Sequence, residues 1–285
     1  TFLFLLGITN AVNLSDGLDG LAGGTVILSI GTIALLGYTT DNAVVVVIAV
    51  AMIGSILGFL RFNTHPAQIF MGDGGSQFLG FSVGVLAVLL TQKGAAPLSP
   101  VLPLLILGLP ILDTAMVMWQ RITSGRSPFA ADKNHIHHKL LGLGFSHYEA
   151  VLLIYIAQAG MVMSAYFLRH QSDAILLLVF LTVSVVLVGF FRWAALSGWR
   201  VRRGDGHAAG YQELQKKIVW LRDEGYPLKI ARGIVVTMIA TYFLSAVLTA
   251  QKITPDIGIL AFALAAFMVA VLTRGRNHSI TWTDQ

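Results

Sequence analysis

The chain has 285 residues, of which 55% are hydrophobic and only 12% are charged, and it contains no cysteine. A soluble domain usually carries about a quarter charged residues, so this composition excludes a water-soluble globule. The lack of cysteine excludes a disulfide scaffold, a thiolate metal site and a thiol nucleophile. A chain this apolar is not intrinsically disordered either, which leaves a polytopic membrane protein.

Long apolar runs predict the fold. A membrane-spanning helix needs roughly 20 mostly apolar residues, and windows of that length predict an all-α, polytopic transmembrane helical bundle of about nine helices. The runs do not alternate in the way that strands of a membrane barrel must. The fourth span contains Gly80 and Gly84, which membrane helices tolerate because small residues suit close backbone approach. The predicted spans lie near residues 1–14, 21–39, 43–60, 77–92, 100–120, 148–168, 173–192, 230–250 and 256–272.

The distribution of Lys and Arg predicts the orientation in the membrane. Consecutive connections alternate between the two sides, and one side receives every one of the 19 cations except Lys93, Arg169 and Lys252. The positive-inside rule makes the cation-rich side cytoplasmic, with the N-terminal end outside and the C-terminus inside. The formal net charge of +5 therefore reflects contact with the lipid bilayer, and we expect no nucleic-acid partner.

These spans divide the chain into four parts. Residues 1–195 form the predicted transmembrane core with cytoplasmic loops, 196–229 a basic amphipathic connector, 230–272 an additional helix hairpin and 273–285 a cytoplasmic tail. We expect the connector to lie in the anionic inner interface of the membrane, with docking of another subunit as the alternative. Because Thr1 stands inside an apolar run without an initiating Met, we expect further residues and helices to precede it.

The first polar cluster lies at the end of the first span. Asn10, Asn13 and Asp16 recur every third residue, so they share one broad helical face, and a glycine-rich turn with Asp19 follows. Amide and carboxylate oxygens are the hard ligands that Mg²⁺ prefers. The cluster therefore predicts a magnesium and substrate site. The alternative is a polar packing stripe followed by a surface turn.

The second cluster lies between two spans on the cytoplasmic side. Residues 72–76 read Gly-Asp-Gly-Gly-Ser and open a predicted helix, an arrangement typical of a phosphate-binding nest. Asp73 in that turn would coordinate the metal that a phosphate brings with it, and Phe70 could stack on a base. The alternative is an ordinary turn whose residues serve only the backbone geometry.

The third cluster is a histidine run in a cytoplasmic loop that also carries Arg and Lys. Three imidazoles in four residues suit either a transition metal or a cationic, hydrogen-bonding patch for phosphate. We favour phosphate because the neighbouring cations would repel a metal ion. The structural alternative is that the histidines only lie at a solvated interface. Asp113, roughly two helical turns before Arg121, is a candidate buried partner that orients this loop. The polar residues of the cluster are Arg121, Arg126, Asp132, Lys133, His135, His137, His138 and Lys139.

Taken together, the three clusters predict phosphoryl transfer. Carboxylates alone would repel a diphosphate, whereas Arg and His alone would bind one without activating it. Carboxylates with a hard cation, facing Arg and His across a cleft, suit a reaction that depends on positioning and charge neutralisation. A site on the inner face of the membrane has access to both a soluble nucleotide and a lipid head group.

The motifs also resemble a known family. Asn-x-x-Asn-x-x-Asp-Gly-x-Asp-Gly-Leu, Asn-x-x-Pro-Ala-x-x-Phe-Met-Gly-Asp-x-Gly-Ser and His-Ile-His-His, in this order, are similar to the polyprenyl-phosphate N-acetylhexosamine-1-phosphate transferases, or glycosyltransferase family 4. The resemblance covers residues 1–195. The third motif is more similar to the N-acetylglucosamine-1-phosphate branch than to the phospho-MurNAc-pentapeptide branch.

The resemblance implies an activity. A member of this family would transfer HexNAc-1-phosphate, here GlcNAc-1-phosphate, from a UDP-N-acetylhexosamine to undecaprenyl phosphate and release UMP. The cofactor would be Mg²⁺, with Mn²⁺ as an alternative. The reaction would be the first membrane step of an envelope polysaccharide, at the cytoplasmic face of a bacterial inner membrane. A homodimer is one option for its assembly.

The resemblance also implies roles for individual residues. Asp73 would be the principal Mg²⁺ ligand, joined by Asn13. The residues with implied catalytic roles are Asp16, Asp19, His135, His137 and His138. The residues with implied substrate contacts are Asn10, Asn13, Asn63, Phe70, Arg121 and Arg126, with Phe70 stacking on uracil.

Two alternatives to an active transferase remain. The family carries an adjacent Asp-Asp pair that this chain lacks, so a catalytically incomplete member is one alternative. A transporter that relays ions through Asp and His is the other. Transporters place polar groups near the membrane midplane, whereas the aspartates here cluster toward one face.

Overall fold

The computed structural model describes residues 1–92, 98–127, 134–201, 212–213 and 216–217. The chain divides into two units, residues 1–206 and 207–285. In the second unit, Lys217 and Glu213 form an ion pair of 3.3 Å one helical turn apart. The predicted spans 230–250 and 256–272, the tail and most of the connector lie outside the described residues.

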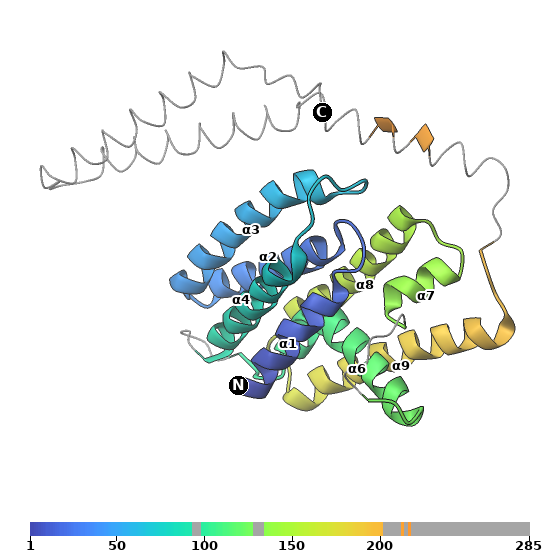
Figure 1. The fold of residues 1–285 in the computed structure, drawn as a ribbon. Coiled ribbons are helices and arrows are strands. Elements are labelled where there is room, and N and C mark those ends of the chain that lie inside the picture. The colour runs from blue at the N-terminus through green and yellow to red at the C-terminus, as the bar shows by residue number, and fades with distance from the viewer. Residues whose placement is uncertain (93–97, 128–133, 202–211, 214–215, 218–285) are drawn as a thin grey trace, which may run out of the picture. The chain divides into compact units, whose positions relative to one another are not determined.

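Every regular element in the described part of the first unit is a helix, which confirms the all-α prediction (Figure 1). Five helices, α2, α3, α4, α8 and α9, are long and apolar enough to cross a membrane, and α1 is a shorter apolar helix. The helices are α1 (Phe2–Ser15), α2 (Leu21–Thr39), α3 (Ala43–Asn63), α4 (Gly72–Gln92), α5 (Pro103–Ile106), α6 (Gly108–Thr123), α7 (Ile136–Gly142), α8 (His147–Phe167) and α9 (Asp173–Ser197).

The single span predicted over 100–120 is wrong, because the chain breaks into α5 and α6 at Leu107. Pro110 lies in the first turn of α6, where the missing proline N–H costs least, so the sequence favours a new helix start here. The amide of Gln158 satisfies the interrupted backbone: its Oε1 accepts from Leu109 N at 3.2 Å and its Nε2 donates to Ile106 O at 2.8 Å. Such internal satisfaction is what a broken helix needs inside a membrane.

Glycines set the distance between α1 and α4. A Cβ at Gly80 would lie 2.9 Å from Thr9 Cα, and a Cβ at Gly84 would lie 2.6 Å from Ile8 Cγ2. The two glycines therefore allow the backbones of α1 and α4 to approach closely. The close contact brings the C-terminal end of α1 beside the first turn of α4.

The polar connections gather at one end of the helix bundle. Figure 1 shows the loop between α1 and α2, the loop between α3 and α4, the short helix α7 and the start of α8 at the same end. Residues that are far apart in sequence and carry the predicted chemistry are therefore brought to one region.

Candidate active site

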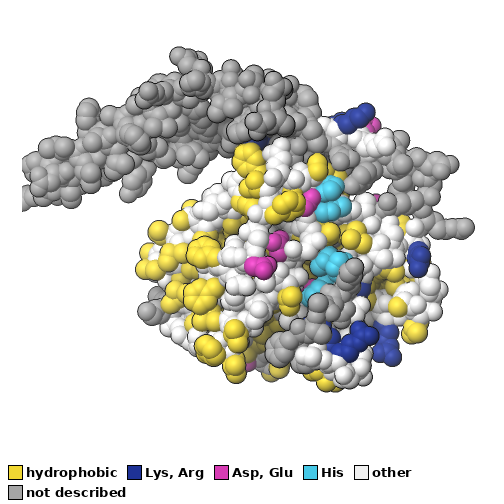
Figure 2. Space-filling view, viewed as in Figure 1, with side chains coloured by type: hydrophobic (Ala, Val, Ile, Leu, Met, Phe, Trp, Pro, Cys, Tyr) yellow, Lys and Arg dark blue, Asp and Glu magenta, His cyan; other side chains and the backbone are white. Residues whose placement is uncertain are grey.

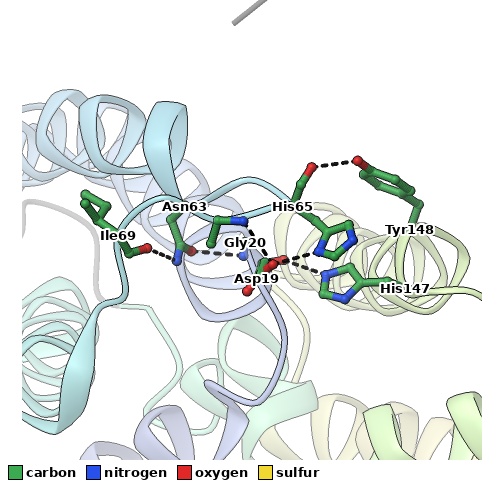
Figure 3. Close-up of polar contacts among 8 residues, drawn as sticks. Asp19, Gly20, Asn63, His65, Ile69, His147 and Tyr148 are labelled. Atoms are coloured by element: carbon green, nitrogen blue, oxygen red, sulfur yellow. Dashed lines mark hydrogen bonds and ion pairs between the residues drawn. The ribbon is translucent and has the colours of Figure 1, made fainter. Parts of the chain in front are cut away.

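Asn63 ties the two loops of the site together. It is the last residue of α3 and is buried; its Oδ1 accepts from Gly20 N and its Nδ2 donates to Ile69 O, both at 2.9 Å (Figure 3). Gly20 adopts a left-handed conformation with φ +79°, which favours glycine at this turn. The amide of Asn63 thus fixes the loop geometry, whereas its predicted contact with a nucleotide stays a prediction.

Asp19 lies at the centre of a polar network from three segments (Figure 3). Its Oδ2 is 2.7 Å from His65 Nδ1 and accepts from Ala67 N at 3.1 Å. Its backbone oxygen is 3.2 Å from His147 Nε2. The rings of His65 and His147 stack with centroids 4.0 Å apart, and the Tyr148 hydroxyl donates to His65 O at 2.6 Å.

Sequence analysis did not single out His65 or His147 as site residues. Both stand where a predicted span meets the cytoplasmic side, His65 just after the third span and His147 just before the sixth. A search for imidazoles at these ends would have found both. Their pairing with Asp19 depends on the tertiary fold, since they are separated by 46 and 128 residues from it.

The carboxylate of Asp16 lies in the field of two others. Asp16 follows the last residue of α1, and burial raises its pKa. The negative charges of Asp73 and Asp19 raise the pKa of Asp16 further. Asp73 is exposed in the first turn of α4. A divalent cation would relieve the mutual repulsion of these carboxylates, so the donor set fits Mg²⁺.

The two asparagines of α1 differ in their surroundings. Asn13 is partly buried, and its Oδ1 accepts a 2.5 Å hydrogen bond from Ser76 Oγ, which joins α1 to α4 beside Asp73. Asn10 is exposed and donates to Leu6 O of its own helix at 3.2 Å. The packing alternative therefore accounts for the Asn13–Ser76 contact, and the roles predicted for both residues toward metal and substrate stay predictions.

A buried aspartate positions the histidine run. Asp113 in α6 places its Oδ2 2.9 Å from His135 Nδ1, and its Oδ1 accepts from Ile136 N at 2.8 Å. Asp113 and His135 are only 6% and 4% exposed. The prediction that Asp113 is a buried partner of this loop is confirmed, and its carboxylate fixes the start of α7.

His137 joins the histidine run to the loop that carries Asp16 and Asp19. A Cβ built on Gly17 would lie 2.2 Å from His137 Nε2, so the ring rests directly against this glycine. Burial, and then the neighbouring His138, lower the pKa of His137 to about 4. The imidazole is therefore neutral at neutral pH and would act on a phosphate as a hydrogen-bonding group rather than as a cation.

The remaining predicted residues surround this cluster. Arg121 is buried in α6, whereas Arg126 and Phe70 are exposed. Figure 2 shows acidic and histidine side chains near one another on one face of the molecule, with apolar side chains on the surface beside them. The site thus offers carboxylates and imidazoles near one another on a face that also carries apolar side chains (Figure 2).

Comparison with known proteins agrees with this arrangement. A family profile described as glycosyl transferase family 4 matches residues 1–91. A Bacillus subtilis protein named probable undecaprenyl-phosphate N-acetylglucosaminyl 1-phosphate transferase is 41% identical over 187 residues, which cover 66% of this chain and 52% of that protein. Residues 1–91 of the chain are thus similar to glycosyl transferase family 4, and the relatives that match a longer part of the chain carry names of one kind.

Other relatives of this chain carry similar names. The Escherichia coli K12 undecaprenyl-phosphate alpha-N-acetylglucosaminyl 1-phosphate transferase is 32% identical over 198 residues, covering 68% of this chain and 54% of that protein. The Mycolicibacterium smegmatis decaprenyl-phosphate N-acetylglucosaminephosphotransferase is 40% identical over 175 residues, which cover 55% of this chain and 43% of that protein. The chain spans about half the length of the curated relatives it matches.

Proposed function

We propose that this chain carries the active site of a Mg²⁺-dependent transferase that moves GlcNAc-1-phosphate from a UDP-sugar to undecaprenyl phosphate. One observation carries the proposal: the loop with Asp16 and Asp19, the first turn of α4 with Asp73 and the helix with His137 meet in one place. The names of the relatives support the acceptor and the sugar phosphate.

The carboxylates and the imidazole would have different roles in the reaction. Asp73 and Asp16 would hold Mg²⁺, which when bound neutralises the charge of the diphosphate. His137, neutral and held in place through α7 and Gly17, would donate a hydrogen bond to a phosphate oxygen. Phe70, which is 77% exposed, offers its ring face to a uracil base.

The transfer itself is a substitution at phosphorus. An oxygen of the lipid phosphate attacks the β-phosphorus of the UDP-sugar and forms a new P–O bond. The bond from the β-phosphorus to the oxygen bridging the two phosphates breaks, and UMP leaves with that oxygen. Because the charge is spread over phosphate oxygens, positioning and electrostatics supply most of the catalysis.

A pocket between α6, α7 and α9 suits the lipid phosphate. It encloses about 540 Å³ and is lined by apolar side chains, among them Met116 and Phe191, together with the cations Lys139 and Arg192. Lys139 also belongs to α7, the helix of His137. An apolar chain with an anionic end would match this lining, on the face that the positive-inside rule makes cytoplasmic.

Replacement of Asp73 tests the proposal. In the full-length protein, Asp73→Asn should lower Mg²⁺-dependent UMP release from UDP-GlcNAc by about 100-fold or more. Asp41→Asn is the matched control: Asp41 is exposed between α2 and α3 with φ +54°, a conformation that asparagine tolerates, so turnover should not change. Normal turnover of Asp73→Asn at saturating Mg²⁺ would refute the assignment.

A further inference from the structure

We propose that Asp19, His65 and His147 form a second metal site, selective for a borderline transition ion such as Zn²⁺ and separate from the Mg²⁺ carboxylates. Each residue offers one ligand atom, and these three atoms lie within 4.8 Å of one another. The residues come from the loop before α2, the loop after α3 and the first residue of α8, so an ion would join three segments (Figure 3).

The donor types set the selectivity. Two imidazoles and one carboxylate are typical ligands of Zn²⁺ and related ions, whereas Mg²⁺ prefers oxygen ligands alone. Three protein ligands would leave a further coordination position for water. The site therefore does not duplicate the carboxylate pair Asp16 and Asp73, whose donor atoms are all oxygens.

The ligands are held before an ion binds. Oδ2 of Asp19 accepts from Ala67 N at 3.1 Å, and the backbone of His65 accepts from the Tyr148 hydroxyl at 2.6 Å. Contacts of this kind orient metal ligands and strengthen binding. An ion entering the cluster would replace the hydrogen bond between His65 Nδ1 and Asp19 Oδ2, which are 2.7 Å apart.

The histidine run of α7 is the competing location for such an ion. His135 directs its Nδ1 to the buried Asp113, and the pKa of the buried His137 falls to about 4. The rings of His135 and His137 lie 5.8 Å apart, and both side chains are buried. Among the residues that the structure describes, the three-ligand cluster with His and Asp together is Asp19, His65 and His147.

Cobalt titration tests the proposal without any transfer assay. The full-length protein, freed of affinity tag and metal, is titrated with Co²⁺ in excess Mg²⁺ while visible absorption is recorded. We expect one Co²⁺ per chain with the strong absorption of a low-coordinate site containing nitrogen ligands, and displacement by Zn²⁺. Absence of Co²⁺ binding to the wild-type protein would overturn the proposal, whatever the variants do.

Histidine variants locate the ion. His147→Asn and His65→Asn should each weaken Co²⁺ binding by at least about 10-fold, and Zn²⁺ should raise the melting temperature of the wild-type protein but not of these variants. His170→Asn, at an exposed site after α8, is the matched control and should bind normally. Loss of Co²⁺ binding in His138→Asn with retention in His147→Asn would place the ion on α7 and overturn the proposal.

Discussion

The imidazole of His137 rests against the backbone of Gly17, with Nε2 only 2.2 Å and Cε1 2.4 Å from the position that a Cβ would take. This contact joins α7 to the loop that carries Asp16 and Asp19, although the two residues are far apart in sequence. A side chain at position 17 could be accommodated only if the imidazole moved. The contact therefore couples the carboxylate half of the site to its histidine half.

Gly17→Ala should separate the two halves of the site. The new methyl group would force the His137 ring and α7 away from the loop, and a displacement of about 1 Å can cost about 100-fold in turnover. UMP release by purified protein measures the loss. Gly58→Ala in α3 is the control, since a Cβ there meets nothing within 4 Å. Equal activity of the two variants would show that the contact is dispensable.

Asp113→Ala should loosen the start of α7. The substitution leaves His135 Nδ1 and Ile136 N without their common acceptor inside the protein, and an unsatisfied buried group costs about 1–3 kcal/mol. We expect a lower melting temperature together with a higher KM for the UDP-sugar. Asp173→Ala, which removes an exposed carboxylate at the start of α9 that accepts from Ser99, should change neither. A normal KM for Asp113→Ala would contradict the positioning role.

The stability of the protein should fall in acid because of His137. Its pKa is about 4 in the folded protein, whereas the unfolded chain has the ordinary value of about 6.5. Between these values the unfolded chain binds the additional proton, so this contribution to stability is complete above pH 6.5 and is lost as pH falls toward 4. The loss is at most about 3 kcal/mol.

Melting temperatures in detergent across this pH range measure the effect. His137→Asn should flatten the dependence, because asparagine does not titrate. His170→Asn, which replaces an exposed histidine, should keep the wild-type slope. A His137→Asn protein with an undiminished slope would show that another group is responsible.

Arg192→Glu should weaken use of the lipid acceptor. The substitution reverses a charge in the lining of the pocket between α6, α7 and α9. We expect the KM for undecaprenyl phosphate to rise by about 10-fold, with little change in the KM for the UDP-sugar. Arg200→Glu, an exposed cation shortly after α9 that does not line the pocket, is the charge-matched control. Equal effects of both variants would indicate a general change in surface charge instead.

Local patterns in the sequence were sufficient for much of the fold. Apolar runs predicted the five long helices, whereas the close contact of α4 with α1 at Gly80 and Gly84 became visible only in the structure. The break at Leu107 was missed because the whole run is apolar enough to count as one span, although Pro110 favours a helix start there. The amide that satisfies the break comes from Gln158 in α8. Hydropathy reports whether residues enter the membrane, but not where a helix is interrupted inside it.

The candidate site, like the fold, could be predicted from the sequence only in part. Residue types predicted that Asp113 is a buried partner of the histidine loop, whereas its contact with His135, 22 residues away, comes from the fold. The pairing of Asp19 with His65 and His147 depends on how three helix ends are arranged in space. Asn63 likewise had the residue type of a ligand contact, whereas its amide is used to join Gly20 to Ile69.

Chemical cross-linking across the 17–137 contact tests the central claim most directly, and the absence of native cysteine makes it simple. The double variant combines Gly17→Cys with His137→Cys. The second substitution removes the imidazole that a side chain at position 17 would meet, so that the two thiols can occupy its space. We predict rapid coupling by a short thiol-specific reagent, and none for the pair Gly58→Cys and His137→Cys. Equally slow coupling of both pairs would contradict the convergence of carboxylates and histidines in a single site.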